Sequence, residues 1–169
     1  FKQIVRAIAT RSGIHASFLP KPLPDQAGSG LHINLSLYMD GRNLFEGDIA
    51  PDSIAGSFMA GVLAHSRELT AFTNPTVNSF KRLVPGFEAP VNMVYSARNR
   101  SAAIRIPVTG SSPKAKRIEF RAPDPSANPY LSFAAQLMAG IDGIRNRIEP
   151  MEPVDKDLYE LPPEEAKNI

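Results

Sequence analysis

The clearest pattern in the chain is an alternation of apolar and polar residues in the stretch GSGLHINLSLYMDGRNLF, which runs from Gly28 to Phe45. The apolar positions are Leu31, Ile33, Leu35 and Leu37, and the polar positions between them are His32, Asn34 and Ser36. Because successive side chains of a strand point to opposite faces, this spacing predicts a strand with one apolar and one polar face. Asp40-Gly41 is a tight-turn dipeptide, so we expect the strand to belong to a hairpin.

Helical spacing of apolar residues predicts three helices. They cover residues 2–12, 52–73 and about 128–145. Asp52 or Ser53 is the predicted N-cap of the second helix, because a short polar side chain there accepts a hydrogen bond from the first turn. The third helix has Pro129 in its first turn and so many apolar positions that we expect it to be largely buried.

Shorter apolar runs predict further strands. GIHASFLPKPLPDQ predicts a short strand that enters a proline-rich turn, and SAAIRIPV and KRIEFRAP each predict one strand. From Asn74 to about Pro90 no period is clear, but Phe80, Val84 and Phe87 are too apolar for a disordered linker. We expect a structured loop there, and long structured loops are usually functional.

Composition narrows the class of protein. The chain has 169 residues, 43% of them hydrophobic, which suits one domain with a sizeable core. The formal charge of +2 is too small to mark the whole molecule as a nucleic-acid binder. The absence of cysteine suits a reducing compartment, and we find neither a signal peptide nor an apolar run of membrane-spanning length. The chain opens on Phe1 inside an amphipathic pattern and stops at PPEEAKNI, so we expect a piece of a longer protein.

Positive charge is concentrated in the middle of the chain. Residues 81–124 hold nine lysines and arginines against three acids. The basic residues are those at 81, 82, 98, 100, 105, 114, 116, 117 and 121, and the acids are those at 88, 119 and 124. Guanidinium groups bind phosphates and carboxylates through paired hydrogen bonds, so this excess predicts a site for anionic ligands.

The strand KRIEFR combines both charges. A period of two places Arg117, Glu119 and Arg121 on one face and Ile118 and Phe120 on the other. One interpretation is a structural charge ladder. Another joins this strand to the polar face of the first: if the two share a sheet, His32 and Glu119 meet as a ligand pair suited to Mg²⁺ or Mn²⁺. Taken alone, His32 is more typical of a hydrogen-bonded surface or core histidine than of a metal ligand.

Two loop features add to this hypothesis. Near a cluster of arginines, Glu88 is suited to accepting a proton or attracting a cation, although it is equally able to pair with Arg82 or Arg98. Gly28-Ser29-Gly30 lacks the spacing of a phosphate-binding loop, so it predicts only a close approach of the backbone. Phosphoryl transfer depends mainly on positioning and on charge neutralisation by metal ions and basic side chains. The basic residues of 81–124 would supply this charge, and His32 with Glu119 would bind the metal ion.

Three segments closely resemble glutamine synthetases of the bacterial and archaeal type I class. They are NPTVNSFKRLVPGFEAPVNMVYSARNRSAAIRIP, KRIEFRAPDPSANPYLSFAAQLMAGIDGI and GSGLH, and the resemblance runs along nearly the whole chain. It implies a C-terminal catalytic-domain fragment that lacks the small N-terminal domain and the C-terminal helices. The implied fold is α+β, with a curved, mostly antiparallel sheet whose polar concave face holds the site and whose outer face is covered by helices 52–73 and 128–145.

The resemblance also implies roles for individual residues. It implies that His32 and Glu119 bind Mg²⁺ or Mn²⁺. Gly28, Arg82 and Arg121 would hold glutamate, and Arg105, Arg117, Lys114 and Ser36 would surround ATP. Arg100 would face the transferred phosphoryl group, and Glu88 would draw a proton from ammonium. Tyr159 matches a tyrosine that some members adenylylate, and Ala27 stands where the family often has an asparagine that contacts glutamate.

The implied activity is ATP-dependent joining of ammonia to the γ-carboxylate of glutamate through γ-glutamyl phosphate. The family implies a cytoplasmic homo-oligomer, a dodecamer at full length, with neither nucleic acid nor a membrane as partner. We expect the isolated chain to be inactive, because the remaining metal ligands and the neighbouring subunit lie outside it. Two alternatives remain: a ligase that joins glutamate to another amine, and a non-catalytic module that keeps the family fold. A basic nucleic-acid-binding domain is disfavoured, because the arginines alternate with apolar residues and Trp is absent.

Overall fold

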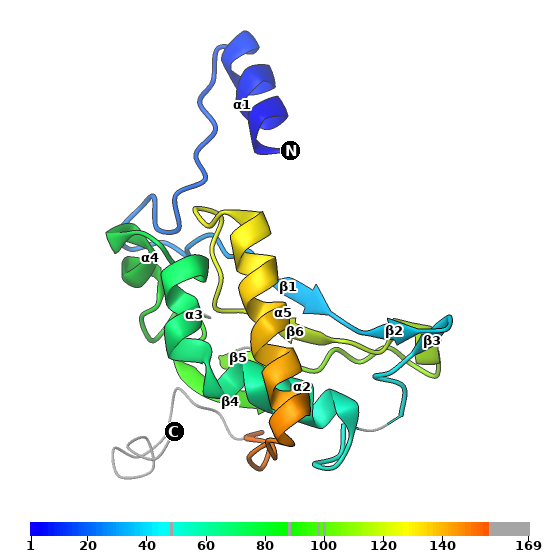
Figure 1. The fold of residues 1–169 in the computed structure, drawn as a ribbon. Coiled ribbons are helices and arrows are strands. Elements are labelled where there is room, and N and C mark those ends of the chain that lie inside the picture. Colours follow the sequence, from blue (N-terminus) through cyan, green and yellow to red (C-terminus); the bar gives the residue numbers. More distant parts are fainter. Residues whose placement is uncertain (48, 88, 98, 100, 156–169) are drawn as a thin grey trace.

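The computed structural model describes residues 1–47, 49–87, 89–97, 99 and 101–155. Its elements, in chain order, are α1 (Lys2–Arg11), β1 (Ile33–Leu35), β2 (Tyr38–Met39), β3 (Arg42–Asn43), α2 (Ile54–Ala64), α3 (Ser66–Thr73), α4 (Val77–Arg82), β4 (Asn92–Ser96), β5 (Ala102–Arg105), the short 3-10 helix η1 (Pro113–Ala115), β6 (Ile118–Phe120) and α5 (Pro129–Asn146). Helices and strands are mixed along the chain, and the fold is α+β as predicted (Figure 1).

The central feature is a four-stranded sheet in the order β1-β6-β5-β4. β6 pairs antiparallel with β1 and with β5, whereas β4 and β5 run parallel. β2 and β3 form a separate two-stranded antiparallel sheet, joined at Asp40 and Gly41, which both have positive φ. The sheet is therefore mostly antiparallel, and the predicted turn at Asp40-Gly41 is confirmed.

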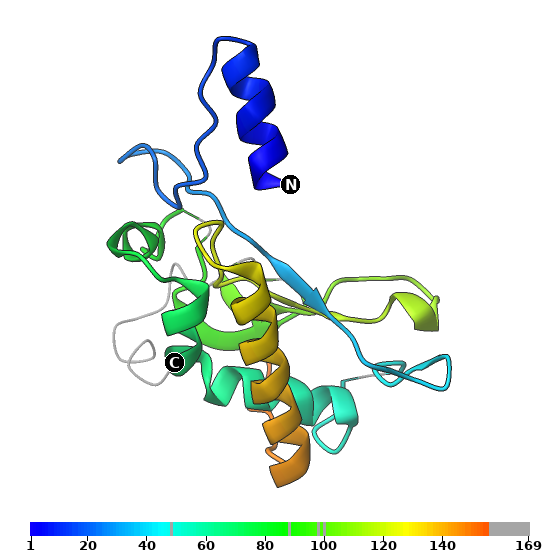
Figure 2. The ribbon, with the colours of Figure 1, turned by 45° about the horizontal axis from the view of Figure 1, so that its top comes forward.

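The core lies on one face of this sheet. Ile118 and Phe120 of β6 are fully buried there, together with Ile104 of β5 and Phe58 of α2. α2 and α5 lie side by side across this face (Figures 1 and 2). The predicted division of the KRIEFR strand is confirmed, since its apolar side chains enter the core and Glu119 projects from the other face.

Glycines let α2 and α5 approach backbone to backbone. A Cβ atom added to Gly143 would lie 2.1 Å from the Ser57 carbonyl oxygen, and one added to Gly140 would lie 2.2 Å from the Phe58 ring. The buried residues of α5 are accordingly small or polar, namely Ser132, Gln136, Ala139, Gly140 and Gly143. The prediction that α5 is largely buried is wrong: Leu131 is 53% exposed and Met138 71%, because the helix turns its small residues toward α2.

Helix boundaries follow local capping. Ser53 caps α2 by accepting a hydrogen bond from the Gly56 N–H at 2.9 Å, as predicted. The predicted helix over 52–73 is in fact two helices, because the backbone leaves helical geometry at His65 (φ −94°, ψ 10°). His65 Nε2 lies 2.9 Å from Asp142 Oδ2 of α5, which connects this turn to the neighbouring helix.

Three other expectations differ from the structure. The residues between α1 and β1 form no strand, because their closely spaced prolines lack the N–H groups that a strand needs. The alternating stretch is not a single hairpin strand, since β1 pairs with β6 and the hairpin begins only at Tyr38. The loop after Asn74 contains α4, whose first turn is capped by Thr76 and Ser79, and neither α4 nor β4 was predicted.

Candidate functional site

Glu119 is the centre of the candidate site. It lies on the middle strand β6 and is paired in register with Asn34 of β1 on one side and with Arg105 of β5 on the other. This register brings one polar residue from each of three adjacent strands to the same face of the sheet. Glu119 is 7% exposed, so its charge is largely removed from water.

The predicted meeting of His32 and Glu119 is confirmed. His32 directly precedes β1, and its Nδ1 lies 3.2 Å from Glu119 Oε1. Burial and the positive charge of Arg121 lower the pKa of His32 below its ordinary value, and they outweigh the opposing attraction of Glu119. The imidazole is therefore neutral near pH 7, which is the form that binds metal ions.

The guanidinium groups of Arg105 and Arg121 share this one carboxylate. Arg105 Nε lies 2.7 Å from Glu119 Oε2, and Arg121 NH1 lies 3.7 Å from the same oxygen. The Arg105 N–H does not point at the oxygen, so within the described structure Arg105 Nε and Glu119 Oε2 are both buried without a hydrogen bond. A buried carboxylate oxygen in this state fits a site that receives a cation or a polar ligand.

The described residues supply only part of the ligand set that a divalent ion needs. His32 and Glu119 offer a neutral imidazole and a carboxylate, which suit Mn²⁺ or Mg²⁺. Among the residues that the structure describes, no third His, Asp or Glu joins them in a group able to hold a metal ion. Within these residues the donor pair is His32 and Glu119, and metal binding by this pair stays a prediction.

Arg82 lies behind the site and is 5% exposed. Its NH1 donates to the Ala122 carbonyl oxygen at 2.8 Å and its NH2 to the Arg121 carbonyl oxygen at 3.1 Å, with a longer contact of 3.3 Å from NH1 to Pro123. A guanidinium has five N–H groups, so these contacts use at most three and leave others for a ligand. The structure therefore assigns Arg82 a structural role that the sequence did not suggest.

The glycines at 28 and 30 have the close contacts predicted for them. A Cβ atom at Gly28 would lie 2.6 Å from the Pro20 carbonyl oxygen and 2.9 Å from Arg82 Cγ. One at Gly30 would lie 2.7 Å from Arg82 NH2 and 2.8 Å from His32 Nε2. Gly28 excludes a side chain because the nearest atom belongs to the backbone, whereas at Gly30 the Arg82 and His32 side chains would have to shift. Both glycines bring the backbone against the candidate site.

A second group of predicted residues lies toward the start of β6. Arg117 Nε donates to Asn34 Oδ1 at 2.8 Å, and its NH1 donates to the Ala115 carbonyl oxygen at 2.9 Å. Lys114 is in η1, which contacts the β2–β3 hairpin through a 2.6 Å hydrogen bond from Tyr38 OH to the Lys114 carbonyl oxygen. Ser36 is exposed and directly follows β1. Sequence reasoning placed Asn34 on the polar face but did not identify it as the partner of Arg117.

Three predicted residues, Glu88, Arg100 and Tyr159, lie outside the described part of the chain. Arg98 does so as well. Arg82, Arg105 and Arg121 lie around His32 and Glu119. Binding of an anionic ligand by these arginines stays a prediction.

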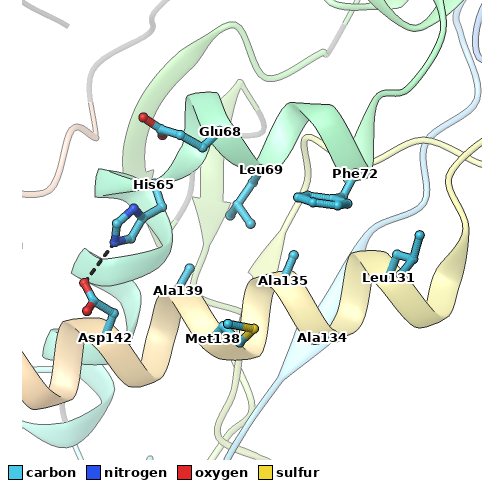
Figure 3. A pocket seen from close by; sticks show the side chains of 10 residues that line it. All are labelled: His65, Glu68, Leu69, Phe72, Leu131, Ala134, Ala135, Met138, Ala139 and Asp142. Atoms are coloured by element: carbon cyan, nitrogen blue, oxygen red, sulfur yellow. Dashed lines mark hydrogen bonds and ion pairs between the residues drawn. The ribbon is translucent and has the colours of Figure 1, made fainter.

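An apolar groove of about 470 Å³ lies elsewhere, between α3 and α5 (Figure 3). Leu69 and Phe72 of α3 and Leu131 and Met138 of α5 line it, and His65 and Asp142 close one end. It contains none of the residues predicted for catalysis or ligand binding, so we exclude it as the candidate active site. No helix among the described residues is long and apolar enough to span a membrane.

Comparison with known proteins decides the family. The family described as glutamine synthetase, catalytic domain, matches residues 1–169. The chain belongs to the glutamine synthetase catalytic-domain family. Similar proteins include glutamine synthetases of Streptomyces filamentosus, 61% identical, and of Salmonella typhimurium, 57% identical; each match covers 100% of this chain and 37% or 36% of the relative.

A solved structure agrees with this assignment. A cryo-electron-microscopy structure of glutamine synthetase from Plasmodium falciparum matches with a TM-score of 0.84 and 41% identity, covering 92% of this chain and 31% of that one. The chain therefore has the fold of this part of a glutamine synthetase catalytic domain. It spans little more than a third of the length of the curated relatives that it matches.

Proposed function

We propose that the chain is part of an ATP-dependent ligase that joins ammonia to the γ-carboxylate of glutamate through γ-glutamyl phosphate, giving glutamine, ADP and phosphate. The observation that carries this proposal is 61% identity to a glutamine synthetase along 100% of the chain. The relatives are much longer, so we propose that residues 1–169 form part of a catalytic domain, with an N-terminal domain and C-terminal helices elsewhere in a complete polypeptide.

We propose a role for each residue of the candidate site. His32 and Glu119 would hold Mg²⁺ or Mn²⁺, which supplies positive charge to neutralise phosphate oxygens. Arg121 and Arg82, with the backbone at Gly28, would bind the carboxylates of glutamate. Arg105, whose Nε lies 2.7 Å from Glu119 Oε2, would bind the ATP phosphates.

Residues beside this centre complete the proposal. Asn34 holds Arg117 through a hydrogen bond, and Arg117, Ser36 and Lys114 would surround the nucleotide. Arg100 would stabilise the charge of the transferred phosphoryl group, and Glu88 would accept a proton from ammonium. Tyr159 is a candidate for adenylylation.

The assembly and location are part of the same proposal. We propose a homo-oligomer, a dodecamer for the complete polypeptide. Large exposed apolar side chains, among them Ile4 at 65% and Met138 at 71%, support faces that are covered in an assembly. Analytical ultracentrifugation of the complete polypeptide tests this directly. We also propose a cytoplasmic location, because the ligase would draw on the ATP pool there.

The test of function is a phosphate-release assay on the complete polypeptide with ATP, glutamate and ammonium, in Mg²⁺ and in Mn²⁺. We expect glutamine formation, a sharp loss in Glu88→Ala and in Arg100→Ala, and no measurable turnover by the 169-residue chain alone. Glu68→Ala is the matched control, because this exposed carboxylate lies on α3 beside the apolar groove, which contains none of the proposed site residues. Turnover with an alkylamine but not with ammonium would assign a γ-glutamyl–amine ligase, and none with either would leave a structural module.

A further inference from the structure

A buried polar network lies directly behind Arg82 and Arg121. It consists of Thr73, Asn74, Asp124 and Ser126, from the end of α3 and from the segment between β6 and α5. Asp124 is 0% exposed and Asn74 is 1% exposed. An ionised carboxylate at this depth is costly unless hydrogen bonds and opposite charge compensate it.

Both oxygens of Asp124 accept hydrogen bonds from N–H donors. Oδ1 accepts from the Ser126 backbone N–H at 2.8 Å and also from the Ser126 hydroxyl, and Oδ2 accepts from Asn74 Nδ2 at 3.1 Å. The Asp124 N–H in turn donates to the Thr73 carbonyl oxygen at 3.1 Å. These bonds hold the chain after β6 against the end of α3.

One carbonyl group connects this network to Arg82. The Ala122 oxygen accepts from Asn74 Nδ2 at 2.8 Å and from Arg82 NH1 at 2.8 Å, so both of its lone pairs are used. Arg82 NH2 donates to the carbonyl oxygen of Arg121, the residue that begins the same segment. The position of the Arg82 guanidinium therefore depends on a backbone segment that Asp124 and Asn74 fix.

Asp124 also supplies charge. Burial lowers the pKa of Arg82, the attraction of Asp124 raises it, and the nearby Arg121 lowers it further. Glu119 is already shared by Arg105 and Arg121. Asp124 is thus the counter-charge that allows a second buried guanidinium to remain close to Arg121.

We propose that Asp124 is a positioning residue that holds Arg82 and Arg121 at the spacing required to bind the carboxylates of glutamate. It acts through the backbone carbonyls of residues 121–123 and through its negative charge, without touching the substrate. This inference rests on the proposed function, in which these two arginines bind glutamate.

The test is Asp124→Asn in the complete polypeptide. Asparagine has the same size as aspartate, but each oxygen of Asp124 accepts a hydrogen bond from an N–H donor. The NH₂ group of the new side chain would therefore meet a second donor, either the Ser126 N–H or the Asn74 NH₂, and one hydrogen bond would be lost. We expect the KM for glutamate to rise about tenfold or more, as is typical when a group that orients a binding residue is lost. The KM for ATP should stay within about twofold.

Ser126→Ala is the matched control, because it removes one hydrogen bond to the same carboxylate and leaves its charge. We expect both KM values of this variant to stay within about threefold of the unsubstituted enzyme. A purely structural role for Asp124 predicts a lower Tm with no difference between the two substrates. A folded Asp124→Asn enzyme with an unchanged glutamate KM, or with equal rises for both substrates, overturns the proposal.

If Asp124→Asn fails to fold, the proposal is tested with Asn74→Ala. This substitution removes one of the two hydrogen bonds to the Ala122 carbonyl oxygen and keeps the charge of Asp124. A selective rise in glutamate KM supports the proposal, and an unchanged value overturns it. Failure of the proposed function is distinguishable, because it shows as an inactive unsubstituted polypeptide before any substitution is made.

Discussion

Replacing Glu119 with glutamine tests whether this carboxylate compensates the arginines around it. The side chain of Glu119 is 9% exposed, that of Arg121 6% and that of Arg105 32%. Removing one member of a buried ion pair costs about 3–5 kcal/mol, and an exposed pair contributes about 1 kcal/mol or less. Arg105 is close to one-third exposed and its N–H is misaligned, so we expect Glu119→Gln to lower the free energy of unfolding by about 2 kcal/mol.

The measurement is urea unfolding of the 169-residue chain at pH 7, followed by far-ultraviolet circular dichroism. Glu46→Gln is the matched control, because Glu46 pairs with Arg42, whose side chain is 73% exposed, and should cost about 0.5 kcal/mol or less. The double variant Glu119→Gln with Arg105→Gln should show a coupling of about 1 kcal/mol. Equal costs for Glu119→Gln and Glu46→Gln would refute the reasoning, because burial would then add nothing to the pair.

Three further predictions concern stability. The pKa of His32 in the folded chain is lowered from 6.5, so between pH 6.5 and that lower value the unfolded chain binds more protons than the folded chain. The free energy of unfolding should therefore fall as the pH drops from 7 through this interval, and His32→Gln should remove part of the fall. Phe58→Ala should cost about 3–5 kcal/mol in urea unfolding, while Met138→Ser, at a 71% exposed position, should stay within about 0.5 kcal/mol. Gly28→Ala should lower Tm, because its Cβ would lie 2.6 Å from the Pro20 carbonyl oxygen; an unchanged Tm would show that this segment moves freely.

The parts of the fold that could be predicted are those in which local pattern and tertiary packing agree. The alternation around Ile33 and around Ile118 predicted which side chains enter the core, because each strand has one apolar and one polar face. The meeting of His32 and Glu119 followed from pairing these two polar faces. The one assumption was that the strands share a sheet, and β1 and β6 are direct neighbours.

α5 shows why burial could not be predicted from hydrophobicity. Its apolar residues occur around most of the helix, so the pattern does not choose the face that packs. The choice depends on how closely α2 can approach, and Gly61 and Gly143 allow a contact that larger side chains would prevent. As a result Gln136 is buried while Leu131 is exposed, although the sequence favoured the opposite.

The networks behind the site could not be predicted for another reason. Asn74 and Asp124 are 50 residues apart, and each stands in a proline-containing segment without a clear period. A polar residue in such a segment is usually a turn former, and nothing in its local pattern distinguishes a buried one. Ser53 was recognisable as a cap because its partner, the Gly56 N–H, lies three residues away.

The charges of the described site leave a net positive centre. Arg82, Arg105 and Arg121 carry three positive charges, Glu119 and Asp124 carry two negative charges, and the lowered pKa of His32 keeps its imidazole neutral near pH 7. The two carboxylates compensate different arginines. Glu119 lies between the guanidinium groups of Arg105 and Arg121, and Asp124 lies behind Arg82. A centre built in this way attracts an anion without requiring it for folding, because each buried guanidinium already has an internal counter-charge. In the proposed function, the positive charge that remains is available to a phosphate or carboxylate group of the substrates.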